Sequence, residues 1–193
     1  MSAPRLASAL AARLADLPGT PRVLLDGVGS HLLADALVEG LAASGRVCLR
    51  TCARDFWRPA GQRLEHGHED PDAFRDDWLG AGALRREVLD AVASGSVLPA
   101  LWDVDRDRSA RAGRRPVPER AVLLVDGVFL LGLGLPAEVV VHLALSPAAL
   151  TRRGLPDWQL PAFTSYDAQV RPGNVYDVLV RAEDPVRPAV RWP

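Results

Sequence analysis

Short blocks of apolar residues along this chain alternate with longer stretches in which apolar positions recur at helical spacing. The short blocks predict strands at residues 22–25, 46–51, 121–125, 138–145 and 176–181. The longer stretches predict helices at residues 1–17, 31–44, 71–79, 83–92, 147–153 and 161–170. Strands rich in Val and Leu that alternate with helices indicate a parallel sheet covered on both faces.

The middle of the chain fits this alternation less well. Residues 55–70 are polar and irregular, a short apolar segment covers residues 97–102, and a charged stretch rich in Arg and Asp follows at residues 103–115. No internal repeat or linker divides the sequence, and 193 residues with 48% hydrophobic content can bury one substantial core. We therefore expect a single α/β domain over residues 1–193 that begins with a helix at residues 1–17.

Composition and charge exclude several classes of protein. The 24 acidic residues nearly balance the 23 basic ones, so no general attraction to nucleic acid is expected. No apolar run has the length of a membrane span, and the opening helix is amphipathic rather than a continuous signal core. Cys48 and Cys52 are too few and too close for a disulfide framework. These features predict a cytoplasmic protein with no membrane partner.

All 23 basic residues are arginine, and the chain contains no lysine. Polar side chains follow the predicted strands, and in parallel sheets ligands bind beyond the carboxyl ends of the strands. We therefore expect Asp26, Arg54, Asp55 and Asp126 to gather at one edge of the sheet. The absence of lysine limits the cations that this edge can offer to arginine and histidine.

Three segments resemble the uridine kinase branch of the P-loop kinases, actinobacterial type, when they are taken together and in this order. They are residues 26–35 (DGVGSHLLAD), residues 54–59 (RDFWRP) and residues 122–131 (VLLVDGVFLL). The resemblance covers residues 20–185. It implies a three-layer P-loop kinase-like domain with a central parallel sheet, ATP and Mg²⁺ as cofactors, and a nucleoside or nucleotide as the small-molecule ligand.

In that family the first segment is a phosphate-binding loop of pattern Gly-x-x-x-x-Gly-Lys-Ser/Thr, whose backbone N–H groups cradle phosphate. Alignment on the residues after the motif places Leu24 on the first Gly, Gly29 on the second, Ser30 on the Lys and His31 on the hydroxyl residue. Gly27 lies in the same turn. Ser30 carries no charge, and His31 is a poor ligand for Mg²⁺, which prefers oxygen. Both losses affect phosphoryl transfer, which depends on electrostatic stabilisation.

The second and third segments carry the other implied catalytic residues. Arg54 stands where the family has the carboxylate that accepts the substrate proton, and Asp55 follows it. An arginine cannot accept that proton at physiological pH, so Asp55 serves as the base only if the strand end is displaced by one residue. Asp126 matches a carboxylate suited to bind magnesium through water, or it is a turn-forming residue of the Asp126-Gly127 pair.

The resemblance also implies a lid, shortened here to residues 151–161, and a substrate-side region at residues 55–115. Arg152 and Arg153 match the start of the lid, where they either clamp phosphate or end a solvated helix. The nucleoside-contacting residues implied by the resemblance are Trp57, Arg58, Arg63 and Glu65. The spacing of Phe74 and Trp78 favours core packing, and the cluster of His and acidic residues at 66–70 favours a solvated loop over a metal site.

Three functions remain open from the sequence. The first is a uridine or nucleoside kinase homologue that binds a nucleoside or phosphorylated ligand, with phosphoryl transfer lost or strongly impaired. The second is an active ATP-dependent kinase in which Arg54 or Arg58 replaces the lysine. The third is a non-catalytic interaction domain, which would expose an apolar patch on the face of Trp102 or Trp158.

Overall fold

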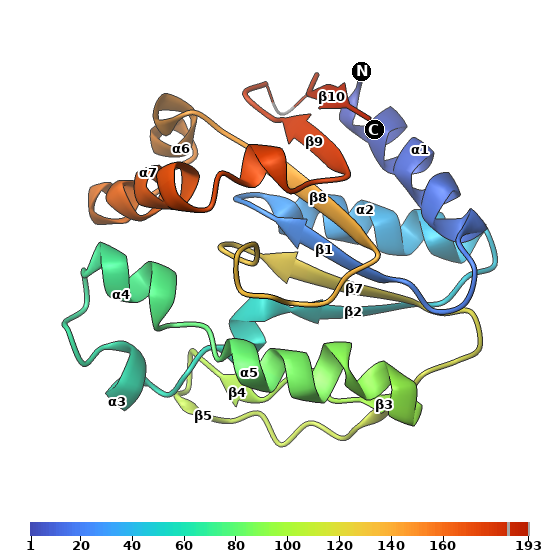
Figure 1. The fold of residues 1–193 in the computed structure, drawn as a ribbon, viewed down its shortest axis with the longest axis horizontal. Helices are drawn as coiled ribbons and strands as arrows, with labels where there is room; N and C mark the ends of the chain where they lie inside the picture. Colours follow the sequence, from blue (N-terminus) through green and yellow to red (C-terminus); the bar gives the residue numbers. More distant parts are fainter. Residues whose placement is uncertain (185, 193) are drawn as a thin grey trace.

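The computed structural model describes residues 1–184 and 186–192, and its centre is a six-stranded sheet of order β10-β9-β8-β1-β7-β2 (Figure 1). The strands are β1 (Arg22–Asp26), β2 (Cys48–Cys52), β7 (Val122–Gly127), β8 (Val139–Ala144), β9 (Val178–Arg181) and β10 (Ala189–Arg191). The first five pair in parallel, and β10 pairs antiparallel with β9 at the edge. The predicted α/β fold with a mostly parallel sheet is confirmed, whereas the edge strand β10 was not predicted.

Two helices cover one face of the sheet. Helix α1 (Ala3–Asp16) packs on α2 (Ser30–Ala43), and together they bury the apolar side chains that recur at helical spacing in both segments. Gly40 allows this approach, because a Cβ atom at that position would lie 2.8 Å from the Cβ of Ala11. Figure 1 shows both helices on the same side of the sheet. Among the described residues no helix is both long and apolar enough to cross a bilayer.

The opposite face is covered less regularly, by α7 (Leu160–Gln169) and by α5 (Ala81–Leu84), which continues into a π-helical turn at Arg85–Leu89. The remaining helices are short: Ala53–Phe56 (η1), Ala60–Arg63 (α3), Pro71–Asp76 (α4), Ala91–Ser94 (η3), Pro147–Arg152 (α6), Asp157–Gln159 (η4) and Pro172–Asn174 (η5). Two small antiparallel pairs join Ser96–Val97 (β3) to Arg115–Pro116 (β6) and Trp102–Asp103 (β4) to Arg108–Ser109 (β5). The predicted helices appear. The helix expected at residues 71–79 ends at Asp76, and the helix expected at residues 83–92 is divided among α5, the π-helical turn and η3.

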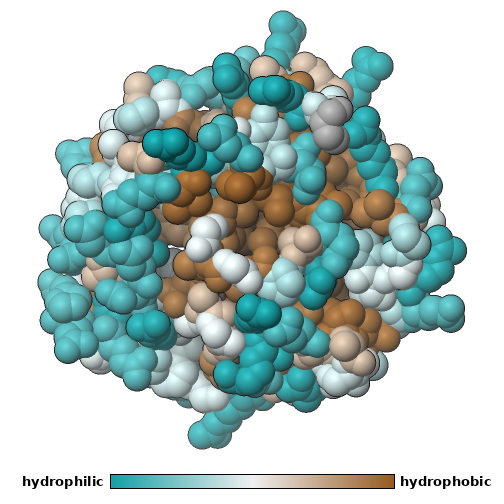
Figure 2. Space-filling view, viewed as in Figure 1, coloured by the Kyte–Doolittle hydropathy of each residue, from teal (hydrophilic) through white to brown (hydrophobic). Residues whose placement is uncertain are grey.

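The connection between β7 and β8 contains no helix, although parallel strands are usually joined by one. Residues 128–138 instead form an irregular loop, and a hollow of about 560 Å³ remains beside it. Leu24 and Val140 of the sheet line this hollow together with Val170 and Val175. Apolar side chains gather in the middle of this face of the molecule, where the connection runs in Figure 1 (Figure 2).

The end of α1 is held by the side chain of Arg46, which is only 6% exposed. Its guanidinium donates hydrogen bonds to the carbonyl oxygens of Leu14, Ala15 and Leu17, at 2.7–2.8 Å, and to those of Gly19 and Arg120. The last carbonyls of a helix lack partners within the helix, and a cation there interacts favourably with the helix dipole. Burial lowers the pKa of Arg46. The carbonyl cage still supplies the acceptors that a buried guanidinium needs.

We predict that Arg46→Ala lowers the free energy of unfolding by about 3 kcal/mol, since it leaves several buried carbonyl groups without a donor. Urea unfolding monitored by circular dichroism measures this as a lower midpoint at an unchanged slope. Arg5→Ala, at an exposed position of α1, is the control, and its free energy of unfolding should stay within about 0.5 kcal/mol of that of the wild type. Equal effects of the two substitutions would contradict the capping role of Arg46.

Candidate functional site

The carboxyl ends of the parallel strands bring three aspartates to one edge of the sheet. Asp26 ends β1 and is 0% exposed, whereas Asp126 lies near the end of β7 and is 1% exposed. Strand β2 pairs with β7 so that Cys52 lies beside Asp126, and the chain then enters η1, which carries Arg54 and Asp55. The structure thus places all four polar residues expected at this edge on adjoining segments, although their side chains have different partners.

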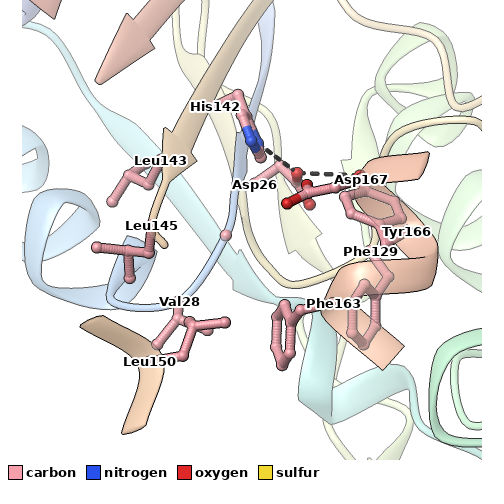
Figure 3. Close-up of a pocket in the computed structure, with 11 residues that line it drawn as sticks. Asp26, Val28, Phe129, His142, Leu143, Leu145, Leu150, Phe163, Tyr166 and Asp167 are labelled. Atoms are coloured by element: carbon pink, nitrogen blue, oxygen red, sulfur yellow. Dashed lines mark hydrogen bonds and ion pairs between the residues drawn. The ribbon is translucent and has the colours of Figure 1, made fainter. Parts of the chain in front are cut away.

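Asp26 is the centre of a buried hydrogen-bond network (Figure 3). Its Oδ1 accepts the backbone N–H of Leu130 at 2.9 Å, and its Oδ2 lies 2.8 Å from Nδ1 of His142 and accepts the hydroxyl of Tyr166 at 3.0 Å. The Tyr166 oxygen in turn accepts the N–H of Leu131 at 3.0 Å. Burial, reinforced by the Asp26 charge, raises the pKa of Tyr166 far above its usual value, so the phenol remains a neutral donor.

Sequence reasoning gave His142 and Tyr166 no role. His142 is on β8 and Tyr166 on α7, far from Asp26 along the chain, and no motif joins the three positions. The available signal was a histidine within a predicted buried strand, because a buried polar group needs a partner. The network ties β1 to β8, α7 and the start of the β7–β8 connection. It therefore fixes the strand end from which the glycine turn departs.

The turn between β1 and α2 is short. β1 ends at Asp26 and α2 begins at Ser30, so only Gly27, Val28 and Gly29 lie between them. Leu24, which aligns with the first glycine of the phosphate-loop pattern, is inside β1 and is 2% exposed. The pattern requires four residues between its two glycines, and two of those positions fall on the strand. The loop that would wrap a phosphate chain is therefore reduced to a tight turn.

The polar groups of this turn are directed largely toward the protein. Gly27 has φ of 117° and donates its N–H to the carbonyl of Gly127 at 2.8 Å. The N–H of Ser30 donates to the carbonyl of Gly27 at 3.2 Å, and its hydroxyl donates to that of Gly127 at 3.3 Å. Ser30 is 3% exposed. At the position of the family's lysine, the side chain thus points toward β7, while the neighbouring His31 is exposed.

The guanidinium of Arg50, on β2, pairs with the carboxylate of Asp126, which the resemblance assigns to magnesium. Its Nε donates to Oδ1 of Asp126 at 2.7 Å and its Nη2 to Oδ2 at 3.1 Å, which is a bidentate ion pair. Its Nη1 forms a second ion pair with Asp35 of α2, and Nη2 also reaches the carbonyl of His31. The hydrogen bond to Asp126 is the main cause that raises the pKa of Arg50. A permanent cation therefore lies against Asp126.

Sequence reasoning did not single out Arg50. The signal was present, because an arginine inside a predicted strand that is covered on both faces needs a buried anion. The pattern of β2 alone could not name that anion. Only the pairing of β2 with β7, which brings Arg50 opposite Leu124 and two positions from Asp126, identifies it.

Arg54 and Asp55 point to different partners. Arg54 is exposed and makes a two-pronged ion pair with Asp105, at 2.6 and 3.1 Å, with its guanidinium 5.6 Å from the ring centroid of Trp57. The half-buried carboxyl group of Asp55 makes no hydrogen bond or ion pair within residues 1–184 and 186–192. Burial raises the pKa of Asp55, Arg54 opposes this, and the charges of Asp126 and Asp103 add to it. Asp55 is thus an unpaired carboxyl group near Asp126.

Two of the residues implied to contact a nucleoside, Trp57 and Arg63, adjoin an aromatic cluster. The ring centroid of Trp57 lies 6.2 Å from that of Phe74 and 5.0 Å from that of Trp78, in edge-to-face contacts. The Arg63 guanidinium lies 5.3 Å from the ring centroid of Trp78. Phe74 and Trp78 are buried, as their spacing predicted. The cluster continues through Trp158, Phe163 and Phe129, and it joins α4 to α7.

Arg58 and Glu65 are exposed, and neither takes part in an ion pair of the described residues. Trp102 and Trp158, proposed as the centre of an apolar surface patch, are half-buried. The described part of the chain contains no group of three His, Cys, Asp or Glu side chains able to hold a metal ion. The side chains of residues 66–70 therefore do not form such a group either.

The two arginines at the start of the shortened lid also differ. Arg153 donates to the carbonyl of Ala182 at 2.8 Å, and its Nη1 lies 2.6 Å from the position that a Cβ atom on Gly29 would take. A side chain at Gly29 would therefore displace it. Arg152 is exposed and makes a loose ion pair with Glu183 at 3.6 Å. Arg153 thus lies directly over the turn, and Arg152 belongs to the surface.

The fold is similar to the folds of three solved kinase structures. One described as a possible uridine kinase from Bacillus stearothermophilus has a TM-score of 0.72 at 18% identity and covers 91% of this chain and 97% of its own. A candidate fructose transport system kinase from Silicibacter sp. TM1040 has a TM-score of 0.60 at 22% identity and covers both chains completely. Phosphoribulokinase from Rhodobacter spheroides has a TM-score of 0.53 at 11% identity, over 83% of this chain and 69% of its own. No family model matches the sequence, and no curated protein matches it.

We predict that Arg50→Met destabilises the protein by about 3 kcal/mol, because it leaves the buried Asp126 carboxylate without its cation. The double substitution Arg50→Met with Asp126→Asn should recover most of this loss, since it removes the uncompensated charge. Urea unfolding of the single and double variants measures both values. Arg54→Met is the control, because its exposed pair with Asp105 contributes less than about 1 kcal/mol. An Arg50 variant no less stable than the Arg54 variant would contradict this.

We predict that Asp55→Asn stabilises the protein at pH 7 and that this gain disappears as the pH falls to about 4. The pKa of Asp55 is raised in the folded state, so its ionisation costs stability, and the wild type loses stability as the pH rises from the ordinary aspartate range through the raised pKa. Thermal unfolding between pH 4 and pH 7 measures the difference. The exposed Glu119→Gln serves as the control. A gain that is independent of pH would show that Asp55 is not strained by its charge.

Proposed function

We propose that this chain is a nucleoside-binding protein built on the P-loop kinase fold and that it does not catalyse phosphoryl transfer. The observation that carries the second half of this proposal is the bidentate ion pair between Arg50 and Asp126. It puts a guanidinium against the carboxylate that the sequence resemblance assigns to magnesium. The nucleoside half rests on Asp55 and on the resemblance to uridine kinases.

The residues at the edge of the sheet do not fit a magnesium-bound triphosphate. Both oxygens of Asp126 accept hydrogen bonds from Arg50. The hydroxyl of Ser30 is turned toward Gly127 and cannot replace a lysine, and His31 brings nitrogen where a hard cation requires oxygen. The tight turn at residues 27–29 offers fewer backbone N–H groups than a full phosphate loop. Losing one preorganised donor commonly costs about 10²- to 10³-fold in rate, and here several are missing.

Asp55 is the residue best suited to hold a nucleoside. A carboxylate accepts hydrogen bonds from ribose hydroxyl groups, and that of Asp55 has no partner among the described residues. Burial raises the pKa of Asp55, and carboxyl groups with raised pKa values are frequent in binding sites. Arg58 is exposed nearby along the chain and carries no ion pair in the described structure, and the half-buried Trp57 offers an aromatic ring. We assign the nucleoside contact to Asp55 with Arg58, and the stacking contact to Trp57.

An active kinase is the second candidate, and one observation favours it. The guanidinium of Arg153 lies over Gly29, where it could supply the positive charge of the missing lysine. Of the two arginines that the sequence suggested for this task, Arg54 is paired with Asp105 and Arg58 is exposed without an ion pair in the described structure. An active enzyme would therefore use Arg153 for charge and Asp55 as the base, and it would have to release Asp126 from Arg50.

Calorimetric titration with uridine, cytidine, adenosine, guanosine and, separately, with magnesium-ATP tests this proposal. We predict that at least one nucleoside binds, that Asp55→Ala weakens its binding at least about tenfold through loss of a charged hydrogen bond, and that magnesium-ATP gives no heat. Asp105→Ala is the control, and it should leave the affinity within about twofold. Formation of a nucleoside monophosphate when the protein is incubated with a nucleoside and magnesium-ATP together would refute the loss of phosphoryl transfer. Absence of binding heat for all four nucleosides would refute the binding role.

A further inference from the structure

A cavity of about 370 Å³ lies between the end of α7 and strands β8, β9 and β10. It is lined by the side chains of three arginines: Arg171, Arg181 and Arg191. Cavities of this size hold small ligands. The three guanidinium groups are the reason to ask what that ligand is.

The unpredicted strand β10 creates this grouping. In its antiparallel pairing with β9, Ala189 lies opposite Arg181 and Arg191 lies opposite Leu179. Residues that pair across such a ladder share a face, so Arg181 and Arg191 project from the same face as diagonal neighbours. The alternate residues, Val180 and Val190, belong to the apolar core on the other face. Sheet register thus forces two positive charges to one side.

Arg171 reaches the same cavity from the end of α7. Its φ of 52° is in the left-handed region, which arginine seldom adopts, and the buried Pro172 follows it. Among the described residues that line the cavity, one is acidic, and it is Asp167. None of the three arginines forms an ion pair with a carboxylate in residues 1–184 and 186–192, whereas nine other arginines do. Three positive charges therefore face one negative charge.

Other hydrogen-bonding side chains complete the wall. Asn174 and Tyr176 line the cavity together with His142, whose Nδ1 contacts Asp26 in the buried network. The chemistry that matches clustered guanidinium groups with adjacent amide and phenol groups is a phosphoryl group, which carries a charge near −2 and accepts bidentate hydrogen bonds. The geometry points to a binding site for a small phosphorylated molecule, whose lining includes neither Asp55 nor Asp126.

A double substitution, Arg181→Ala with Arg191→Ala, tests this site by calorimetry. The probes are inorganic phosphate and ribose 5-phosphate, which distinguish a free anion from a phosphorylated metabolite, and uridine, which reports on the proposed nucleoside site. We expect ribose 5-phosphate or phosphate to bind the wild type and to bind the double variant at least about tenfold more weakly, because two charge-assisted hydrogen-bonding groups are lost. Uridine binding should be the same for both proteins.

The control is Arg108→Ala with Arg115→Ala, which removes the same charge from two exposed arginines on β5 and β6. It should leave phosphate affinity within about twofold of the wild type. The site is refuted if neither phosphate probe binds the wild type, if the control weakens binding as much as the test variant, or if a short single-stranded RNA binds these arginines more tightly than either probe. Because uridine is followed in parallel, loss of this site and failure of the nucleoside proposal are distinguishable.

Discussion

The ion pair of Arg50 with Asp126 governs the chemistry of the carboxyl edge of the sheet. Both groups are on neighbouring parallel strands, so their contact follows from the register of β2 with β7 rather than from a mobile loop. A carboxylate 1% exposed cannot remain charged without a nearby cation or several donors, and here the chain supplies the cation itself. The same guanidinium also contacts Asp35 and the carbonyl of His31, and so binds the first turns of α2 to the sheet. The side chain of Arg50 thus joins β2, β7 and α2 at this edge.

A second buried carboxylate, that of Asp26, has its own set of partners and no arginine among them. It accepts hydrogen bonds from a backbone amide and a phenol and contacts the imidazole of His142, all three from segments distant in the chain. The two aspartates end adjacent strands, yet one is joined to α2 and the other to α7 and β8. The glycine turn of residues 27–29 joins the anchored end of β1 to α2, and it is tight because only three residues lie between them. Asp55, one segment further along, is the carboxyl group that no such network satisfies.

The hydrophobic pattern predicted most of the fold, because strands buried on both faces and helices buried on one follow directly from the period of apolar residues. It missed β10, whose three residues, Ala189–Arg191, are too few and too exposed to show a period. It placed Asp26, Asp55 and Asp126 at one edge, since chain order and parallel pairing suffice for that. It could not predict their partners, because Arg50, His142 and Tyr166 meet them only through strand register and helix packing. The resemblance to uridine kinases named the positions of a loop, whereas the structure showed how short the turn is.

The absence of lysine has structural consequences beyond the missing residue of the loop. Arginine stays charged under all physiological conditions and offers five donors in a planar fork, so each one that is buried must be given several acceptors. Arg46 receives them from carbonyl groups at and beyond the end of α1, and Arg50 receives them from two carboxylates. The half-buried Arg153 donates to the carbonyl of Ala182. The arginines that line the cavity beside β10 are exposed and make no ion pair within the described residues, so their donors are open to solvent and to the anion proposed above. Arginine thus braces the buried parts of the chain and also supplies exposed donors at its surface.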